Sequence, residues 1–240
     1  MAKLQFKAEK IAEFSDSREM PAYSIPQAAH YLQMPVATLR SWVLGRDYPT
    51  GRGTKRFRPV IRLPDEERPL LSFFNLAEAH VLNALRRDHS IRLQDVRSAL
   101  NYIQNELGAA HPLLDYRFET NGVALFVTKL GKLVEASAAG QLVMREVLDA
   151  YLKRLEREDL VVARLYPFTR ARETDGPKLV LIDPRHSFGR PVLARARIAT
   201  AVIAERYKAG ESIDDLADDY ACERLEVEEA LRCELSLEAA

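Results

Sequence analysis

Cationic side chains gather between residues 44 and 62, in a segment interrupted by glycine and proline. Guanidinium and ammonium groups are the usual contacts to phosphate, and phosphate contacts supply much of the affinity for nucleic acid. We interpret this basic loop as a segment that contacts phosphate groups. The alternative is a basic loop that is solvated and binds no partner. Its cations, set against the single acid Asp47, are Arg46, Arg52, Lys55, Arg56, Arg58 and Arg62.

The preceding residues, 23–43, have the pattern of two short helices around a tight turn. Pro35 ends the first helix, because the residue before a proline avoids the α region. A second helix is predicted from about Val36, with Leu39 and Val43 facing inward. A helix pair of this kind can place its second helix in the major groove of DNA. The alternative is a helix pair that only packs in a protein core. The side chains predicted on or near its outer face are Thr38, Arg40, Ser41 and Trp42.

A second cationic segment covers residues 182–198, IDPRHSFGRPVLARARI, and its prolines and glycine predict a rigid, turn-rich path. From Glu211 onward the chain becomes acidic, with eleven Asp or Glu against two Arg. The arginines of the segment could contact a partner or could pair with these acids. They are Arg185, Arg190, Arg195 and Arg197.

The chain lacks the usual signatures of an enzyme. Its five histidines are scattered without metal-ligand spacing, and Cys222 and Cys233 match neither a metal site nor a disulfide framework. It has no phosphate-binding glycine motif and no nucleophile elbow. We therefore expect no catalytic residue, no metal and no cofactor.

Composition is that of an ordinary globular protein, with 47% apolar residues and a net charge of zero over 240 residues. A zero net charge argues against a protein that is basic throughout, so the local charge clusters carry the information. The N-terminus does not have the pattern of a signal peptide, and no apolar run approaches the length of a membrane span. We expect a soluble, cytoplasmic protein.

Several further elements are predicted after the basic loop. Arg58–Leu63 and Pro69–Phe74 read as the two strands of a hairpin wing. Asn75 is expected to cap the next helix, and a further helix should end at Gly108. Asn121-Gly122 is the favoured pair for a tight hairpin between strands at about 115–120 and 123–128.

The remaining pattern is mostly helical. Residues 141–157 predict a helix whose broad apolar face packs in the core or, alternatively, forms a dimer interface. A strand at 160–166 and a polar linker at 169–178 follow. A compact three-helix unit then begins near residue 199, and Ser212 caps its second helix. The expected fold is mainly α with small β elements, in segments 22–110, 111–168 and 178–235.

The order of YSIPQAAHYLQMPVATLRSW, a basic loop, a wing and LAEAHVLNALRRDHSIRLQDVRSALNYI resembles the winged helix-turn-helix of MerR-type regulators over about residues 22–107. In that family the second helix enters the major groove and the wing contacts the backbone. The resemblance implies base-side contacts from Thr38, Arg40, Ser41 and Trp42. It implies backbone contacts from Arg46, Lys55, Arg56, Arg58 and Arg62.

Residues 178–235 are similar to the small antitoxin-like domain called domain of unknown function 433, through Ile182, Asp183, Pro184, Gly189, Pro191 and the helices that follow. That family belongs to bacterial toxin–antitoxin pairs whose toxin is a PIN-like ribonuclease. The full layout looks like a VapB-type antitoxin. An arginine placed among the metal-binding carboxylates of such a nuclease would compete with the metal and with the RNA phosphate. The candidate toxin-binding residues are Arg185, Phe188, Arg190, Arg195 and Arg197.

The sequence thus leads to the hypothesis of a dimeric antitoxin that inhibits a PIN-like ribonuclease and binds its own operator DNA as a repressor. The acidic C-terminal helices could instead meet a basic surface of the toxin. Two other functions are compatible with the sequence. One is a MerR-like regulator that binds a small effector and has no toxin partner, and the other is an interaction scaffold with degenerate DNA-binding helices.

Overall fold

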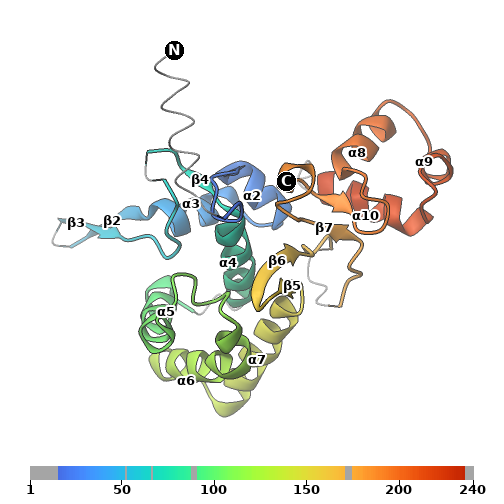
Figure 1. Ribbon diagram of the computed structural model, residues 1–240. Coiled ribbons are helices and arrows are strands. Elements are labelled where there is room, and N and C mark those ends of the chain that lie inside the picture. The colour runs from blue at the N-terminus through green and yellow to red at the C-terminus, as the bar shows by residue number, and fades with distance from the viewer. Residues whose placement is uncertain (1–15, 52, 66, 88–90, 171–174, 236–240) are drawn as a thin grey trace.

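The computed structural model describes residues 16–51, 53–65, 67–87, 91–170 and 175–235. It is mainly helical with small two-stranded antiparallel sheets, which confirms the predicted fold class. A hairpin projects at one end of the molecule, a central helix group lies below it, and three C-terminal helices lie at the opposite end (Figure 1). None of the described helices is both long enough and apolar enough to cross a lipid bilayer.

The two N-terminal helices form where they were predicted. The side chain of Ser24 caps α2 (Ile25–Tyr31) by accepting a hydrogen bond from the Gln27 N–H, and α3 (Val36–Leu44) follows the turn at Pro35. Leu39 and Val43 are buried as expected. Strand β1 (Tyr23–Ser24) pairs with β4 (Leu70–Leu71), which ties the entry of α2 to the segment before the next helix.

The hairpin lies earlier in the chain than predicted. Strands β2 (Arg46–Thr50) and β3 (Gly53–Phe57) pair antiparallel within the basic loop, with Arg46 opposite Phe57. The predicted wing at Arg58–Leu63 and Pro69–Phe74 is wrong. Ile61 and Leu63 are buried singly in an irregular segment. Leu70–Leu71 form β4, which pairs with β1, and Phe73 and Phe74 begin the next helix, so the two predicted strands do not pair with each other.

Helix α4 (Phe73–Asn83) begins three residues earlier than Asn75 would imply. Ser72 is its cap: the Asn75 N–H donates to the Ser72 hydroxyl, and the Ser72 N–H donates to the Asn75 side chain, both at 3.2 Å. A 3-10 turn (Ala84–Arg87) extends it. Helix α5 (Leu93–Leu107) then ends at Gly108 in a left-handed conformation, as predicted.

The central hairpin predicted at 115–128 is wrong. A π-helical turn (Phe118–Gly122) leads directly into α6 (Val123–Leu133), and Gly122 has helical dihedral angles. The apolar side chains repeat every three or four residues and are buried, so helical packing overrides the turn preference of Asn-Gly. The buried side chains of this face are Val123, Phe126, Val127 and Leu130.

Helix α7 (Ala138–Leu152) is shorter than predicted, because residues 155–158 form a strand. Strand β5 (Leu155–Glu158) pairs with β6 (Val161–Leu165), the strand predicted at 160–166. Leu142 and Val143 on α7 are each 57% exposed, so the apolar face is narrower than the sequence implied. The predicted linker, 169–178, includes residues 171–174, which lie outside the described residues.

The C-terminal module has its own apolar core, built on Leu193, Ile203, Leu216 and Val227. Its helices confirm the predicted three-helix unit, including the cap at Ser212. Backbone hydrogen bonds between Leu165 and Ile182 join the module to β6. Its elements are β7 (Val180–Leu181), β8 (Val192–Leu193), α8 (Thr200–Lys208), α9 (Ile213–Asp219) and α10 (Arg224–Leu235).

The join between α3 and the hairpin requires glycine at position 45. Gly45 has φ +73°, and a Cβ there would lie 2.2 Å from the Phe57 carbonyl oxygen. We expect Gly45→Ala to lower the free energy of unfolding by more than about 2 kcal/mol, through left-handed strain and this collision. Gly51→Ala is the matched control, because a Cβ at Gly51 meets nothing within 4 Å. Urea unfolding of both variants tests this, and equal stabilities would contradict it.

Candidate nucleic-acid interface and partner-binding loop

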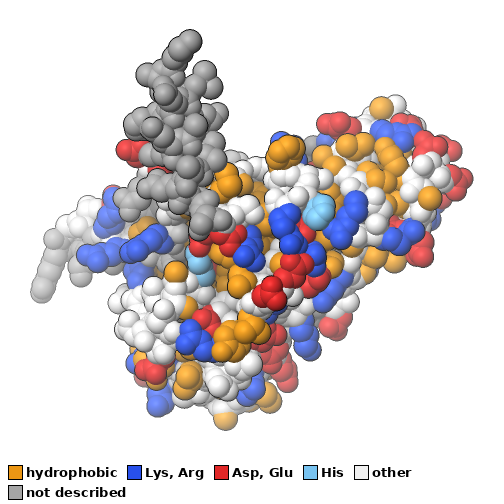
Figure 2. Space-filling view, in the orientation of Figure 1, with side chains coloured by type: hydrophobic (Ala, Val, Ile, Leu, Met, Phe, Trp, Pro, Cys, Tyr) orange, Lys and Arg blue, Asp and Glu red, His pale blue; other side chains and the backbone are white. Residues whose placement is uncertain are grey.

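The first candidate surface consists of arginines on α3, on the hairpin and just after it. These side chains are exposed, and within the described residues none of their guanidinium groups makes an ion pair or hydrogen bond. Basic side chains also gather near the base of the projecting hairpin in Figure 2. The structure thus brings together most of the predicted backbone-contacting cations. The arginines of this surface are Arg40, predicted to contact bases, and Arg46, Arg56, Arg58 and Arg62, predicted to contact the DNA backbone. Lys55 lies on β3 opposite Tyr48, and its side chain is outside the described part.

The predicted base-side face of α3 is only partly correct. Arg40 is exposed, whereas Thr38 and Ser41 are half-buried, and the Ser41 hydroxyl donates to the Thr38 carbonyl at 2.7 Å. Trp42 was expected on or near the outer face but is 2% exposed, so that expectation is wrong. Its backbone carbonyl accepts the N–H groups of Val60 and Ile61, which folds the chain after the hairpin over this end of α3.

The hairpin is held to the helical body at its base. The Arg97 guanidinium of α5 lies 3.9 Å from the centre of the Phe57 ring, a cation–π contact at the end of β3. Together with the close approach at Gly45, this contact fixes where the hairpin leaves the domain. The orientation of the basic hairpin relative to α3 is therefore set by packing at its base, and strands β2 and β3 project away from the helices (Figure 1).

The second candidate surface is the loop that follows β7, and a buried carboxylate organises it. Asp183 is 1% exposed and accepts the backbone N–H of Arg185 at 2.9 Å. The side chains of Arg164, Arg185 and His186 also lie within 3.3 Å of its oxygens. Burial alone would raise the pKa of Asp183, but hydrogen bonds from Arg185 and His186 outweigh burial and lower the pKa to about 2. The carboxylate is therefore charged and fixes the path of the loop.

Phe188, at the tip of this loop, is 94% exposed. Ser187, Phe188 and Gly189 all have positive φ, between 49° and 72°, a conformation that costs a residue with a side chain. The fold therefore holds an aromatic ring in water on a strained turn. Large apolar side chains in such positions are candidates for burial against a partner.

The arginines of the segment separate into two groups. Arg185 pairs with Asp183 and with Glu158 of β5, and Arg195 pairs with Glu226 of α10 at 2.6 Å. Arg195 therefore pairs with the acidic C-terminal helices, as the alternative predicted. Arg185 is also paired within the chain, but with acids that precede those helices, so the predicted partners are wrong for Arg185. Arg190 and Arg197 are exposed, and their guanidinium groups form no ion pair or hydrogen bond within the described residues.

The N-terminal domain supports the loop directly. The Tyr23 hydroxyl donates to the Gly189 carbonyl at 3.0 Å, and burial raises the pKa of Tyr23, which keeps the hydroxyl protonated. A Cβ at Gly189 would lie 2.1 Å from the Tyr23 hydroxyl oxygen. Sequence reasoning missed Tyr23 as a support of the loop, because the two residues are far apart in the chain.

Arg164 and Glu158 are also supports that the sequence did not reveal. Arg164 on β6 donates to Asp183 at 3.1 Å and to Glu158 at 2.6 Å, and it pairs with Glu156. Figure 2 shows acidic and basic side chains intermingled over β5 and β6. The sequence contained one sign of this arrangement. Acids at positions 156 and 158 have the spacing that places both side chains on one face of a strand.

Two family models match the chain, one at each end. Residues 21–100 match the model described as "Putative DNA-binding HTH domain", and residues 180–232 match "Protein of unknown function (DUF433)". Over 229 residues the chain is 26% identical to the "Putative antitoxin VapB45" of Mycobacterium tuberculosis, which covers 89% of this chain and 93% of that protein. The chain resembles VapB-type antitoxins that carry a helix-turn-helix domain.

Two further similarities extend over most of the chain. Rv2308, an uncharacterized protein of the same bacterium, is 22% identical over 224 residues, with 89% of both chains covered. A crystal structure of Rv2018 from Mycobacterium tuberculosis superimposes with a TM-score of 0.63 at 23% identity, over 88% of this chain and 98% of that one. This structural likeness shows a shared fold.

Asp183→Asn tests whether the buried carboxylate organises the loop. The lowered pKa corresponds to about 2 kcal/mol of stability at pH 7, so the variant should unfold more easily by that amount. The carboxyl binds a proton near pH 2 when folded and near 3.8 when unfolded. The difference between wild type and variant should therefore fade as the pH falls from about 4 to about 2.

The control is Asp218→Asn, at an exposed aspartate of α9. It should change the free energy of unfolding by less than about 0.5 kcal/mol. Chemical unfolding at several pH values measures both variants. A difference for Asp183→Asn that persists unchanged at pH 2 would contradict an ionic role for Asp183.

Proposed function

We propose that the chain is an antitoxin that binds operator DNA with its N-terminal domain and inhibits a PIN-like ribonuclease with its C-terminal module. The observation that carries the proposal is where the arginines with and without an ion-pair partner lie among the described residues. Arginines of β6 and the C-terminal module are largely engaged in ion pairs, including Arg164, Arg185, Arg195, Arg206 and Arg224. Free exposed arginines lie on α3, along the hairpin segment and at the C-terminal loop.

Exposed arginines without acidic partners suit phosphate binding. An ion pair within the protein would have to be broken before such a side chain could neutralise a phosphate, whereas a free guanidinium loses only water. Arg40 lies on the helix that would enter the major groove, and Arg56 and Arg58 lie on and beside the hairpin strand that would follow the backbone. The match to a DNA-binding helix-turn-helix family supports this part of the proposal.

Alanine substitutions should separate backbone contacts from base contacts. Arg56→Ala or Arg58→Ala should weaken binding to the DNA upstream of the gene and to unrelated DNA alike. Each should make the slope of log affinity against log salt shallower by about 1, since one phosphate contact is lost. Arg40→Ala should instead reduce the preference for the upstream DNA, at a cost of about 1–3 kcal/mol if Arg40 contacts a base edge.

Fluorescence anisotropy at several salt concentrations measures these effects. Arg145→Ala is the control, because Arg145 is exposed on α7 and its ion pair with Asp149 is 3.9 Å long. If the hairpin variants bind DNA as the Arg145 variant does, with the same salt slope, the proposed interface is wrong.

The partner-binding part of the proposal rests on Phe188 and Arg190. An exposed aromatic side chain and a free arginine, two residues apart on a rigid loop, form a compact anchor of the kind that dominates protein interfaces. PIN-like ribonucleases hold a divalent metal in a cluster of carboxylates, and Arg190 could enter such a cluster and displace the metal. Arg197 is a second free cation of the module, whereas Arg185 and Arg195 serve internal pairs.

The proposed partner is the product of the open reading frame beside this gene, tested as a PIN-like ribonuclease. Phe188→Ser should weaken binding to it by roughly 30-fold or more, which corresponds to an interface hot spot of about 2 kcal/mol. Arg190→Glu should have a similar effect if it meets carboxylates. Both variants should bind DNA as the wild type does. Isothermal titration calorimetry measures the affinities, and Tyr116→Ser is the control because Tyr116 is a 42% exposed aromatic outside the module. Equal affinities for Phe188→Ser and Tyr116→Ser would contradict the assignment.

A further inference from the structure

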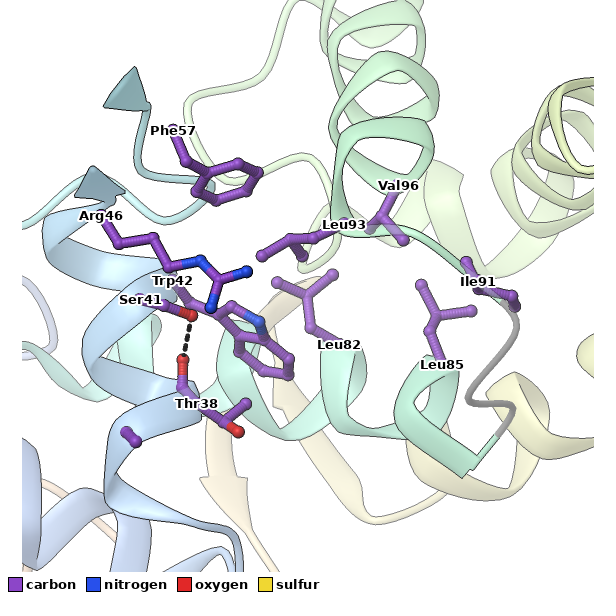
Figure 3. Close-up of a pocket in the computed structure, with 11 residues that line it drawn as sticks. Thr38, Ser41, Trp42, Arg46, Phe57, Leu82, Leu85, Ile91, Leu93 and Val96 are labelled. Atoms are coloured by element: carbon purple, nitrogen blue, oxygen red, sulfur yellow. Dashed lines mark hydrogen bonds between the residues drawn. The ribbon is translucent and has the colours of Figure 1, made fainter. Parts of the chain in front are cut away.

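A pocket of about 300 Å³ lies between α3, the base of the hairpin and the helices α4 and α5 (Figure 3). Its volume is at the lower end of the range for small-molecule sites. Much of its wall is apolar and comes from elements distant in sequence. The apolar side chains are Phe57, Leu82, Leu85, Leu93 and Val96.

Two hydrogen-bond donors of this pocket, on Arg46 and Trp42, lack a partner within the described residues. The Arg46 side chain reaches from the start of β2 toward the pocket and Trp42 (Figure 3). Within the described residues, the Arg46 guanidinium makes no ion pair, and the indole N–H of Trp42 makes no hydrogen bond. The Ser41 hydroxyl is already used by the Thr38 carbonyl. No acidic residue is among the described residues that line the pocket.

We infer that this pocket binds a small organic anion with an apolar body, such as an aromatic carboxylate or sulfonate. The anionic group pairs with the Arg46 guanidinium, and the apolar body packs against Leu82, Leu93 and Val96. A cationic ligand is disfavoured by Arg46, and a fully apolar ligand would leave that guanidinium desolvated without a partner.

Binding in this pocket would also change the DNA-binding surface. Arg46 is one of the exposed cations of the hairpin segment, and Ser41 and Trp42 belong to α3. An anion on Arg46 takes the place of a DNA phosphate and holds the hairpin base against α5. This consequence rests on the proposed function, whereas ligand binding itself does not.

The pocket contains its own reporter, because Trp42 is the single tryptophan of the chain. The probe is 1-anilinonaphthalene-8-sulfonate, an aromatic sulfonate, titrated into the full chain. Saturable quenching of Trp42 with one probe per chain is expected. Arg46→Gln should weaken the affinity roughly tenfold, since a charge-assisted contact is lost. Arg56→Gln removes the same charge outside this pocket and should leave the affinity unchanged.

A second pair of variants separates charge from packing. Leu93→Glu places a carboxylate at a half-buried position of the wall, and Leu93→Gln is its neutral counterpart. The Glu variant should bind the probe at least tenfold more weakly than the Gln variant, because the added carboxylate repels the sulfonate and pairs with Arg46. Absence of saturable Trp42 quenching in the wild type would overturn the inference, as would equal affinities for wild type, Arg46→Gln and Leu93→Glu.

DNA binding in the presence of the probe tests the consequence. The probe should lower the DNA affinity of the wild type and have less effect on that of Leu93→Glu. If the probe quenches Trp42 but DNA affinity is unchanged, the pocket is a binding site and the link to DNA is refuted. If the chain binds no DNA at all, the proposed function fails, and the Trp42 titration still decides whether the pocket binds the anion.

Discussion

Asp183 is a buried carboxylate at which strand β6 meets the loop that follows β7. It receives Arg164 from β6, the backbone and side chain of Arg185, and the ring of His186. A charge in this position is stable only while these donors surround it, so the loop and the strand pair must fold together. The same loop receives Tyr23 from the N-terminal domain. The segment around Tyr23 and strand β6 are thereby both held against the loop that carries the exposed ring of Phe188.

The distribution of ion pairs explains how a chain with zero net charge can have surfaces of different function. Acids of β5, α9 and α10 neutralise the arginines around them, as Glu158 does for Arg185 and Glu226 does for Arg195. The hairpin segment has a single acid, Asp47, among several arginines and a lysine. Its described arginines, Arg46, Arg56, Arg58 and Arg62, face solvent. The molecule therefore has a basic hairpin segment and a C-terminal module in which acids neutralise most of the arginines.

The sequence predicted those helices whose ends have side-chain caps or stop residues and whose buried faces repeat at helical spacing. Helices α3 and α5 and the C-terminal helices are of this kind, with Pro35, Gly108 and Ser212 at their ends. The hairpin at 46–57 was missed because its strands are short, charged and solvent-exposed, which is not a typical strand pattern. The central hairpin was wrongly predicted because a local Asn-Gly preference was weighed above the helical repeat after Gly122.

The candidate sites were predictable as segments but not as contacts. The basic loop and the arginine-rich segment were both identified, but the burial of Trp42 was not. Its backbone carbonyl accepts hydrogen bonds from Val60 and Ile61, which come close to α3 only when the chain folds back after the hairpin. The internal pairing of Arg185 depends on Glu158, which becomes a neighbour only when β5 forms. Such long-range partners leave no local signal in a single sequence.

The most direct measurement is an RNA-cleavage assay of the protein encoded by the open reading frame beside this gene, tested as the proposed PIN-like ribonuclease and titrated with the full chain. Cleavage should fall with added chain and stop at a fixed stoichiometric ratio, because the C-terminal loop occupies the nuclease. Undiminished cleavage in an excess of folded chain, with no complex on size-exclusion chromatography, would contradict the antitoxin function.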